Sequence, residues 1–270
     1  MSFLVVGRNS FLAGRFRALS QIAADCHFIT HQEAETAPPS ELQPFDCIIN
    51  FAIDPGYRSE RYAMERDFDL KLAQKTPSQG RYIMLSSRAV YGRDVAMGAK
   101  ETEPATGNET TYGRNKLETE HRLTELLGDR LTVLRIANII GDELGSGRRT
   151  FMSLALERLK SENEILLDIS PDVRRDFLPD NVFVRVLDAA LQDPQGGPLN
   201  VGSGLPVRVS DIAGWLIEGF GAGQIVVSDR RVHDEFVLNT ERLKARYGIG
   251  CAVEDIAKHC RNIGRTLRER

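Results

Sequence analysis

Short apolar runs alternate with amphipathic helical patterns along the first 140 residues, and this order limits the fold more than any other feature. Residues 3–6 are apolar throughout and stop at Gly7, which is typical of a strand buried on both faces of a parallel sheet. Residues 12–23 then repeat apolar side chains at the spacing of a helix. Similar strand-like runs follow at 26–30, 47–52, 82–86 and 131–136. Because strands and helices that alternate with short connections build parallel sheets, we expect an α/β protein with a doubly wound, Rossmann-like parallel sheet.

The composition excludes several classes of protein. In 270 residues, 35 basic and 38 acidic side chains leave a net charge of -3, so the chain is no globally basic nucleic-acid binder. The four cysteines, Cys26, Cys47, Cys251 and Cys260, form no CxxC pair, so we expect neither a disulfide framework nor a metal site. No apolar run reaches the ~18 residues of a membrane span, and the first residues do not resemble a signal peptide. We therefore expect a cytoplasmic protein with neither a membrane nor a nucleic acid as partner.

Gly7 marks the junction of the first strand and the first helix. At such a junction a dinucleotide pyrophosphate meets free backbone N–H groups and the positive end of a helix dipole. The usual fingerprint has three glycines, but here Ser10 and Ala13 take the second and third places. An ordinary strand-to-helix turn is the alternative for this signal taken alone. We expect the cofactor to contact Gly7, Arg8, Asn9, Ser10, Phe11 and Leu12.

The end of the second strand bears on the choice between NAD and NADP. An acidic residue normally holds the ribose hydroxyls of NAD there. This chain has His31 and Gln32 at that place, and its first acidic residue, Glu33, lies slightly beyond the expected position. Arg8 and His31 are suited instead to a 2′-phosphate, so we expect NADP or NAD, with a preference for NADP. Phe51 and Ala52, at the carboxyl end of the third strand, should line the cofactor groove.

Tyr112 and Lys116 are four residues apart, which places both on one face of a helix. A free tyrosine titrates near 10, too high for a base at neutral pH, and a neighbouring cation favours the phenolate. Tyr112 is thus a candidate acid and base for a carbinol oxygen during hydride transfer, and Lys116 is a candidate for tuning Tyr112 and for holding the nicotinamide ribose. A chance pair is the alternative for this motif alone. The order of the glycine turn, then Ser86 and Ser87, then Tyr112 resembles a known constellation, and this resemblance argues against chance.

Five segments occur in a characteristic order: Leu85–Gly92, Arg135–Gly141, Arg175–Val182, Leu199–Gly204 and Asn239–Leu243. They are similar to the SSxxVYG, RxxNxxG, RDFxxVDDV, YNVGSG and D(T/S)xK(L) segments of the extended short-chain dehydrogenase/reductases. The chain therefore resembles the NAD-dependent epimerase/dehydratase group of that family over nearly its whole length.

The resemblance implies roles for individual residues. Ser87, Tyr112 and Lys116 would be catalytic, with Ser87 bonding the substrate hydroxyl. Asn138 would face the substrate, and Arg175 would contact the diphosphate of a nucleotide sugar. Arg88 and Arg231 are further candidates for substrate binding, because arginine forks match phosphate oxygens.

Three departures from the family pattern matter. Asp67 stands where a helix asparagine often helps to shape the site, and Asp180 with Asn181 replaces the usual pair of aspartates. The family's dehydratases carry an acidic residue soon after the active-site serine or threonine. This chain has Arg88 and Ala89 there, which argues against dehydration.

We expect residues 1–141, completed by about 176–202, to form the dinucleotide-binding domain. Residues 142–175 and 203–270 should form a small C-terminal substrate-binding lobe. The predicted function is that of an NAD(P)-dependent epimerase or reductase of a nucleotide sugar. A reductase of a non-sugar carbonyl and a non-catalytic, cofactor-sensing member are the alternatives. The identity of the sugar and of the nucleotide stays open, as does a homodimer.

Overall fold

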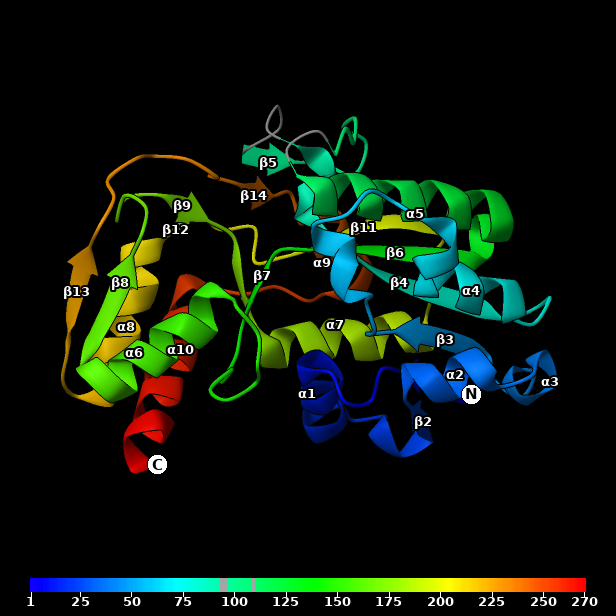
Figure 1. Ribbon diagram of the computed structural model, residues 1–270, viewed down its shortest axis with the longest axis horizontal. Helices are drawn as coiled ribbons and strands as arrows, with labels where there is room; N and C mark the ends of the chain where they lie inside the picture. Colours follow the sequence, from blue (N-terminus) through cyan, green and yellow to red (C-terminus); the bar gives the residue numbers. More distant parts are fainter. Residues whose placement is uncertain (93–96, 108–109) are drawn as a thin grey trace.

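The computed structural model describes residues 1–92, 97–107 and 110–270. A six-stranded parallel sheet lies at its centre (Figure 1). In spatial order the strands are β11 (Gly197–Val201), β6 (Leu131–Ile136), β4 (Arg81–Ser87), β3 (Cys47–Asn50), β1 (Phe3–Val6) and β2 (Cys26–Ile29). The predicted doubly wound, Rossmann-like fold is therefore confirmed.

Strand β1 lies between β2 and β3, and Phe3 is in register with Cys26 on one side and with Cys47 on the other. The chain thus builds β2 on one side of β1 and then crosses back to build β3 on the other. A reversal of this kind opens a crevice outside the carboxyl ends of the strands, where ligands of open α/β sheets bind.

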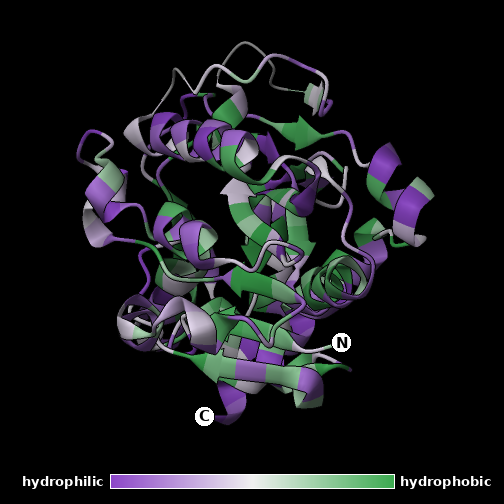
Figure 2. Ribbon diagram, turned by 90° about the vertical axis from the view of Figure 1, so that its right-hand side faces the viewer, coloured by the Kyte–Doolittle hydropathy of each residue, from purple (hydrophilic) through white to green (hydrophobic). Residues whose placement is uncertain are grey.

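The alternation of side chains along the strands separates two apolar layers. Phe3 and Val5 face the layer that contains α1 (Phe11–Leu19) and α7 (Asp180–Gln192). Leu4 and Val6 face the opposite layer, formed by α2 (His31–Thr36), α3 (Pro39–Leu42), α4 (Phe68–Lys75) and α5 (Thr111–Leu127). Both faces of the sheet are therefore buried, and its strands are largely apolar along their length (Figure 2).

A second core lies beside the carboxyl ends of the sheet (Figure 1). Helices α6 (Phe151–Glu162), α8 (Val209–Phe220) and α10 (Val253–Glu269) share it with the parallel pair of β8 (Glu164–Leu167) and β13 (Gln224–Val227). Leu243 on α9 (Glu241–Tyr247) and Ile249 pack instead in the core beneath α7. Part of the chain expected in the C-terminal lobe thus packs against the parallel-sheet domain.

Between β3 and β4 the structure has a 3₁₀ turn, η3 (Met64–Arg66), and then α4. Asp67 separates them because its side chain caps α4, accepting a hydrogen bond of 3.1 Å from the backbone N–H of Leu70. The other carboxylate oxygen of Asp67 accepts from Tyr62 and Thr119, so this residue ties α4 to α5.

The remaining short elements connect these layers. They are η1 (Ala23–Asp25), η2 (Pro55–Arg58), η4 (Arg88–Tyr91), β5 (Met97–Ala99), η5 (Gly128–Arg130), β7 (Asn138–Ile140), β9 (Arg174–Arg175), β10 (Phe177–Pro179), β12 (Val207–Arg208) and β14 (Val237–Leu238). Within the described residues, every helix is too short or too polar to span a membrane.

Candidate active site

A cavity of about 630 Å³ opens where β1, β3, β4 and β6 end, and the segment before α6 forms its far wall. It brings together eleven of the residues singled out from the sequence. They are Asn9, Ser10, Phe11, Leu12, Phe51, Ala52, Ser87, Tyr112, Lys116, Asn138 and Arg175. Gly7, Arg8, His31, Arg88 and Arg231 do not line it.

Gly7 keeps the first turn close to the end of β3. Its φ of +90° lies in the region that side chains disfavour, and a Cβ there would stand 2.8 Å from the backbone nitrogen of Ala52. Ser10 caps α1 by accepting a hydrogen bond of 3.2 Å from Ala13, which leaves its own hydroxyl proton for a ligand. The backbone N–H groups of Phe11 and Leu12 open α1 and have no acceptor within an α-helix.

These residues fit the dinucleotide that the sequence implies. The cavity is lined by the turn between Asn9 and Leu12, and Tyr112 and Lys116 lie in the same cavity. The N–H groups and the dipole of a helix start suit a pyrophosphate. In this arrangement the turn would hold the pyrophosphate, and Tyr112 with Lys116 would face the nicotinamide ribose.

The end of β2 differs from the expectation for a 2′-phosphate site. Arg8 pairs with Glu33, with 3.3 Å between Nη2 and Oε1, and both side chains are exposed. The backbone N–H and the hydroxyl of Thr30 donate to the Glu33 carboxylate and lower its pKa. The ring of His31 lies 5.2 Å from that of Phe68. Arg8 therefore already has a carboxylate partner at the end of β2, where the adenine ribose of a dinucleotide would lie.

Tyr112 and Ser87 are brought together by a close contact between α5 and η4. The carbonyl oxygen of Ala89 lies 2.4 Å from the point where a Cβ of residue 113 would stand, so only glycine fits beside Tyr112. The Ser87 hydroxyl, at the end of β4, accepts a hydrogen bond from Ala89. The packing of α5 on η4 therefore depends on Gly113 and puts both hydroxyl groups on the wall of the cavity.

Lys116 is buried and forms an ion pair with Asp69 on α4, with 3.6 Å between Nζ and Oδ2. Asn50 and Tyr82 donate hydrogen bonds of 3.0 and 2.9 Å to the same carboxylate. Although burial opposes a charged ammonium, the Asp69 carboxylate raises the pKa of Lys116 above its usual value. The lysine thus lies on the wall of the cavity with its ammonium directed at the Asp69 carboxylate.

A second cation lies beside Tyr112. The guanidinium of Arg58, on η2, is 5.4 Å from the centre of the Tyr112 ring, at a distance typical of a cation–π contact. Tyr57 meets the same ring edge-on, with ring centres 6.4 Å apart. The phenol of Tyr112 is therefore oriented by η2 as well as by α5.

Arg175 lies on the wall of the cavity beside Phe177. Its guanidinium contacts Asp234, with 2.9 Å from Nη2 to the carboxylate and a hydrogen bond of 3.0 Å from Nε to the carbonyl oxygen. Asp234 also pairs with Arg88, whose guanidinium stacks 3.7 Å above the ring of Phe236. One carboxylate thus holds two of the arginines expected to bind substrate.

The residue after Arg175 explains why three of the segments singled out from the sequence meet. Asp176 is buried, and its carboxylate accepts hydrogen bonds from the backbone of Ser203, Gly204 and Leu238. It therefore links the segment around 175–182 to the segments around 199–204 and 239–243. Arg175 owes its place on the cavity wall to this connection.

Arg231 is not brought to the cavity. Its side chain is 82% exposed and pairs with Asp229 two residues away. His259, next to Cys260, donates a hydrogen bond to the carbonyl oxygen of Ile140 and lies 3.2 Å from the Asp180 carboxylate. In the described part of the chain no three His, Cys, Asp or Glu side chains are grouped to hold a metal ion.

Sequence reasoning missed Arg58, Asp69 and Asp234. Asp69 lies in a stretch whose sequence is typical of a surface helix. The burial of one carboxylate does not change the apolar periodicity of such a helix. Arg58 and Asp234 lie in connections, where the sequence does not tell which element a side chain faces. The one available hint was Lys116 itself, because a charged lysine that becomes buried needs a nearby carboxylate such as Asp69.

Comparison with known proteins agrees with this geometry. The model of the "NAD dependent epimerase/dehydratase family" matches residues 29–202, more than half of the chain. No curated protein sequence matches at a significant level.

Solved structures with the same fold align over the full chain at low sequence identity. A UDP-N-acetylglucosamine 4-epimerase from Methanobrevibacter ruminantium, solved with UDP-N-acetylmuramic acid, has a TM-score of 0.82 at 17% identity and covers 100% of this chain and 99% of its own. RMD from Pseudomonas aeruginosa, solved with NADPH, has a TM-score of 0.77 at 20% identity and covers both chains fully, 100% and 100%. UDP-glucuronic acid 4-epimerase from Bacillus cereus, solved with NAD, has a TM-score of 0.75 at 16% identity, with coverage of 99% and 100%.

Proposed function

Because this chain belongs to the NAD-dependent epimerase/dehydratase family and is an NAD(P)-dependent enzyme, we propose that it is an epimerase or reductase of a nucleotide sugar. One observation carries the proposal. A single cavity holds the start of α1, the Ser87, Tyr112 and Lys116 side chains, and Arg175. The residues that could hold a dinucleotide, an acid–base pair and an arginine suited to a diphosphate thus line the same cavity. Nucleotide sugars bound to structures of the same fold point to the same substrate class.

The proposed chemistry assigns one task to each side chain. A bound nicotinamide supplies the site for hydride transfer. Oxidation of a carbinol removes a hydride from carbon and a proton from oxygen, and Tyr112 takes that proton. The Ser87 hydroxyl holds the reacting oxygen. In the reverse direction Tyr112 returns the proton to the carbonyl oxygen.

Lys116 supports Tyr112 and binds the ribose of the cofactor. The pair with Asp69 keeps its ammonium charged and pointing in one direction despite its burial. Arg58 supplies a second positive charge at the ring of Tyr112. Arg88, which stands where a dehydratase has an acid, is turned toward Phe236 and Asp234, in keeping with epimerisation or reduction rather than dehydration.

An epimerase and a reductase with these groups differ in the fate of the hydride. An epimerase returns it to the same substrate and keeps its cofactor, whereas a reductase exchanges the cofactor after each turnover. Denaturing the purified protein distinguishes an epimerase from a reductase. A tightly held cofactor is released into the supernatant only if the protein is an epimerase.

NADP is expected to bind more tightly than NAD, since β2 ends without a carboxylate of its own and the exposed Arg8 beside it can exchange its Glu33 partner for a 2′-phosphate. Titration of both reduced cofactors by fluorescence measures the preference, and Arg8→Ala should reduce it. The reverse order, with NAD about tenfold tighter, a difference of about 1.4 kcal/mol, would make Glu33 the ribose ligand and contradict the prediction.

Replacement of Arg175 by alanine is expected to raise the KM of the nucleotide sugar by about 10- to 150-fold, because charge-assisted arginine–phosphate bonds contribute about 1.5–3 kcal/mol. Cofactor affinity should stay unchanged. Steady-state kinetics and binding of UDP-, GDP- and dTDP-sugars provide the measurement.

Arg231→Ala is the matched control, since Arg231 is exposed and lies outside the cavity. An equal loss in both variants would point to a general charge effect. If no nucleotide sugar binds to the folded, cofactor-loaded wild type, the substrate class is wrong and a non-sugar carbonyl becomes the better candidate.

A further inference from the structure

Arg148 lies over the start of α1, where the cofactor turn ends. Its guanidinium is 5.3 Å from the centre of the Phe11 ring, and both residues line the cavity. The tip of the same ring lies 3.0 Å from the position that a Cβ of Gly141 would take. Residues 141–148 therefore fold across Phe11, the first residue of α1.

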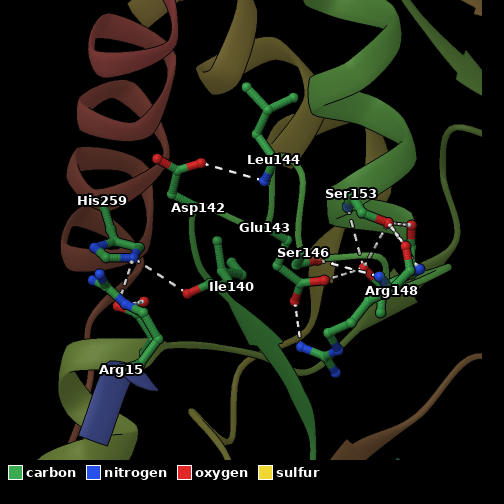
Figure 3. Close-up of polar contacts among 11 residues, drawn as sticks. Arg15, Ile140, Asp142, Glu143, Leu144, Ser146, Arg148, Ser153 and His259 are labelled. Carbon is green, nitrogen blue, oxygen red and sulfur yellow. Dashed lines mark hydrogen bonds and ion pairs between the residues drawn. The ribbon is translucent and has the colours of Figure 1, made fainter. Parts of the chain in front are cut away.

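The guanidinium is held in place by its own segment (Figure 3). Its Nη1 donates a hydrogen bond of 2.8 Å to Oε1 of Glu143, a carboxylate only 1% exposed. Thr150, the cap of α6, donates to the other oxygen of Glu143. The backbone of Arg148 is fixed as well, because Ser153 donates to its carbonyl oxygen at 2.6 Å. An arginine anchored at one nitrogen and at its backbone presents its remaining donors in a defined direction.

The cofactor turn, residues 9–12, offers fewer contacts to a pyrophosphate than the full glycine motif, and Arg148 can supply an additional one. Ser10 and Ala13 replace two of the three usual glycines, so the backbone approaches a pyrophosphate less closely than in the full motif. The cation next to the turn, Arg8, pairs with Glu33 and does not line the cavity. Among the described residues Glu143 is the one carboxylate that contacts Arg148, and it engages a single nitrogen of the fork.

We propose that Arg148 binds the pyrophosphate of the dinucleotide and closes the cofactor groove from the side of the substrate lobe. The inference rests on the cofactor of the proposed function and is independent of its substrate. A diphosphate is also present in a nucleotide sugar. Contact with Phe11 at the start of α1 favours the cofactor, whereas Arg175 on β9 lies beside Phe177 on another part of the wall.

Arg148→Ala is expected to raise the Kd of NADH and NADPH by about tenfold, measured by fluorescence titration without substrate. The loss should be the same for ADP-ribose, which keeps the pyrophosphate but lacks the nicotinamide. Arg149→Ala is the matched control, because this neighbour lines the same cavity, is exposed and should change the Kd less than about threefold. Thermal unfolding of each variant checks the fold, and Arg148→Gln is judged by the same criterion if the alanine variant does not fold.

Three results would overturn the proposal. Unchanged affinity of Arg148→Ala for NADH and NADPH would remove Arg148 from the cofactor site. A loss for NADH without a loss for ADP-ribose would assign it to the nicotinamide. Weaker binding of UDP-glucose with unchanged cofactor binding would assign it to the substrate diphosphate. If the wild-type protein binds no dinucleotide at all, the proposed cofactor of the enzyme is wrong.

Discussion

Tyr112→Phe is expected to lower kcat by about 100- to 10,000-fold while the fold and the cofactor affinity persist, because positioned acid–base catalysis contributes a factor of that size. The substitution removes only the phenolic oxygen. The ring keeps its edge-on contact with Tyr57 and its contact with Arg58. Turnover of the nucleotide sugar, together with fluorescence titration of NADH, measures the two expectations separately.

Tyr62→Phe serves as the control for the loss of a tyrosine hydroxyl. Tyr62 donates a hydrogen bond of 2.7 Å to Asp67 and lies outside the cavity, so turnover should change little. Near-normal turnover of Tyr112→Phe would remove Tyr112 from the chemistry. Loss of turnover with a parallel loss of cofactor binding would give it a structural role instead.

Glu120→Ala is expected to lower the free energy of unfolding by about 3–5 kcal/mol, because it leaves a buried arginine without its counter-charge. Glu120 on α5 is 4% exposed and pairs with Arg135 on β6, with 2.7 Å between Oε2 and Nη2. Ser86 donates to the same carboxylate. Urea unfolding followed by circular dichroism measures the loss.

The same helix offers a matched control. Glu118 pairs with Arg122 one turn along the exposed face of α5, and Glu118→Ala should cost no more than about 0.5 kcal/mol. The double variant Glu120→Leu with Arg135→Met should recover most of the loss, since an apolar pair of similar size often replaces a buried ion pair. A loss below about 1 kcal/mol in Glu120→Ala would mean that water reaches Arg135 when the carboxylate is removed.

The resemblance located Arg135 within a family motif, yet the structure turns its side chain away from the cavity. The guanidinium lies between Glu120 and the ring of Tyr91, 4.8 Å from the ring centre. Asn138, three residues later, does line the cavity. A motif therefore marks a stretch of chain, while the direction of each side chain follows from the pleat of the strand and the elements packed on it.

The sequence by itself determined the order of strands and helices and the place of Tyr112 and Lys116 on one helix. Both depend on local periodicity, and the strands β1, β3, β4 and β6 and the helix α5 appear where the apolar patterns put them. The interruption at Asp67 is equally local, because a side chain that caps a helix acts within three residues.

Only the tertiary structure decided which charges meet. Arg88 pairs with Asp234, which lies 146 residues further along the chain. Arg175 donates to the backbone carbonyl of the same residue, 59 residues further along. Lys116 on α5 pairs with Asp69 on α4, and Arg148 covers Phe11 from the opposite wall of the cavity. No spacing rule joins such residues, because the contacts depend on how connections of irregular conformation pack against the sheet. Burial then makes each pairing necessary, since an isolated charge in the interior costs far more free energy than a paired one.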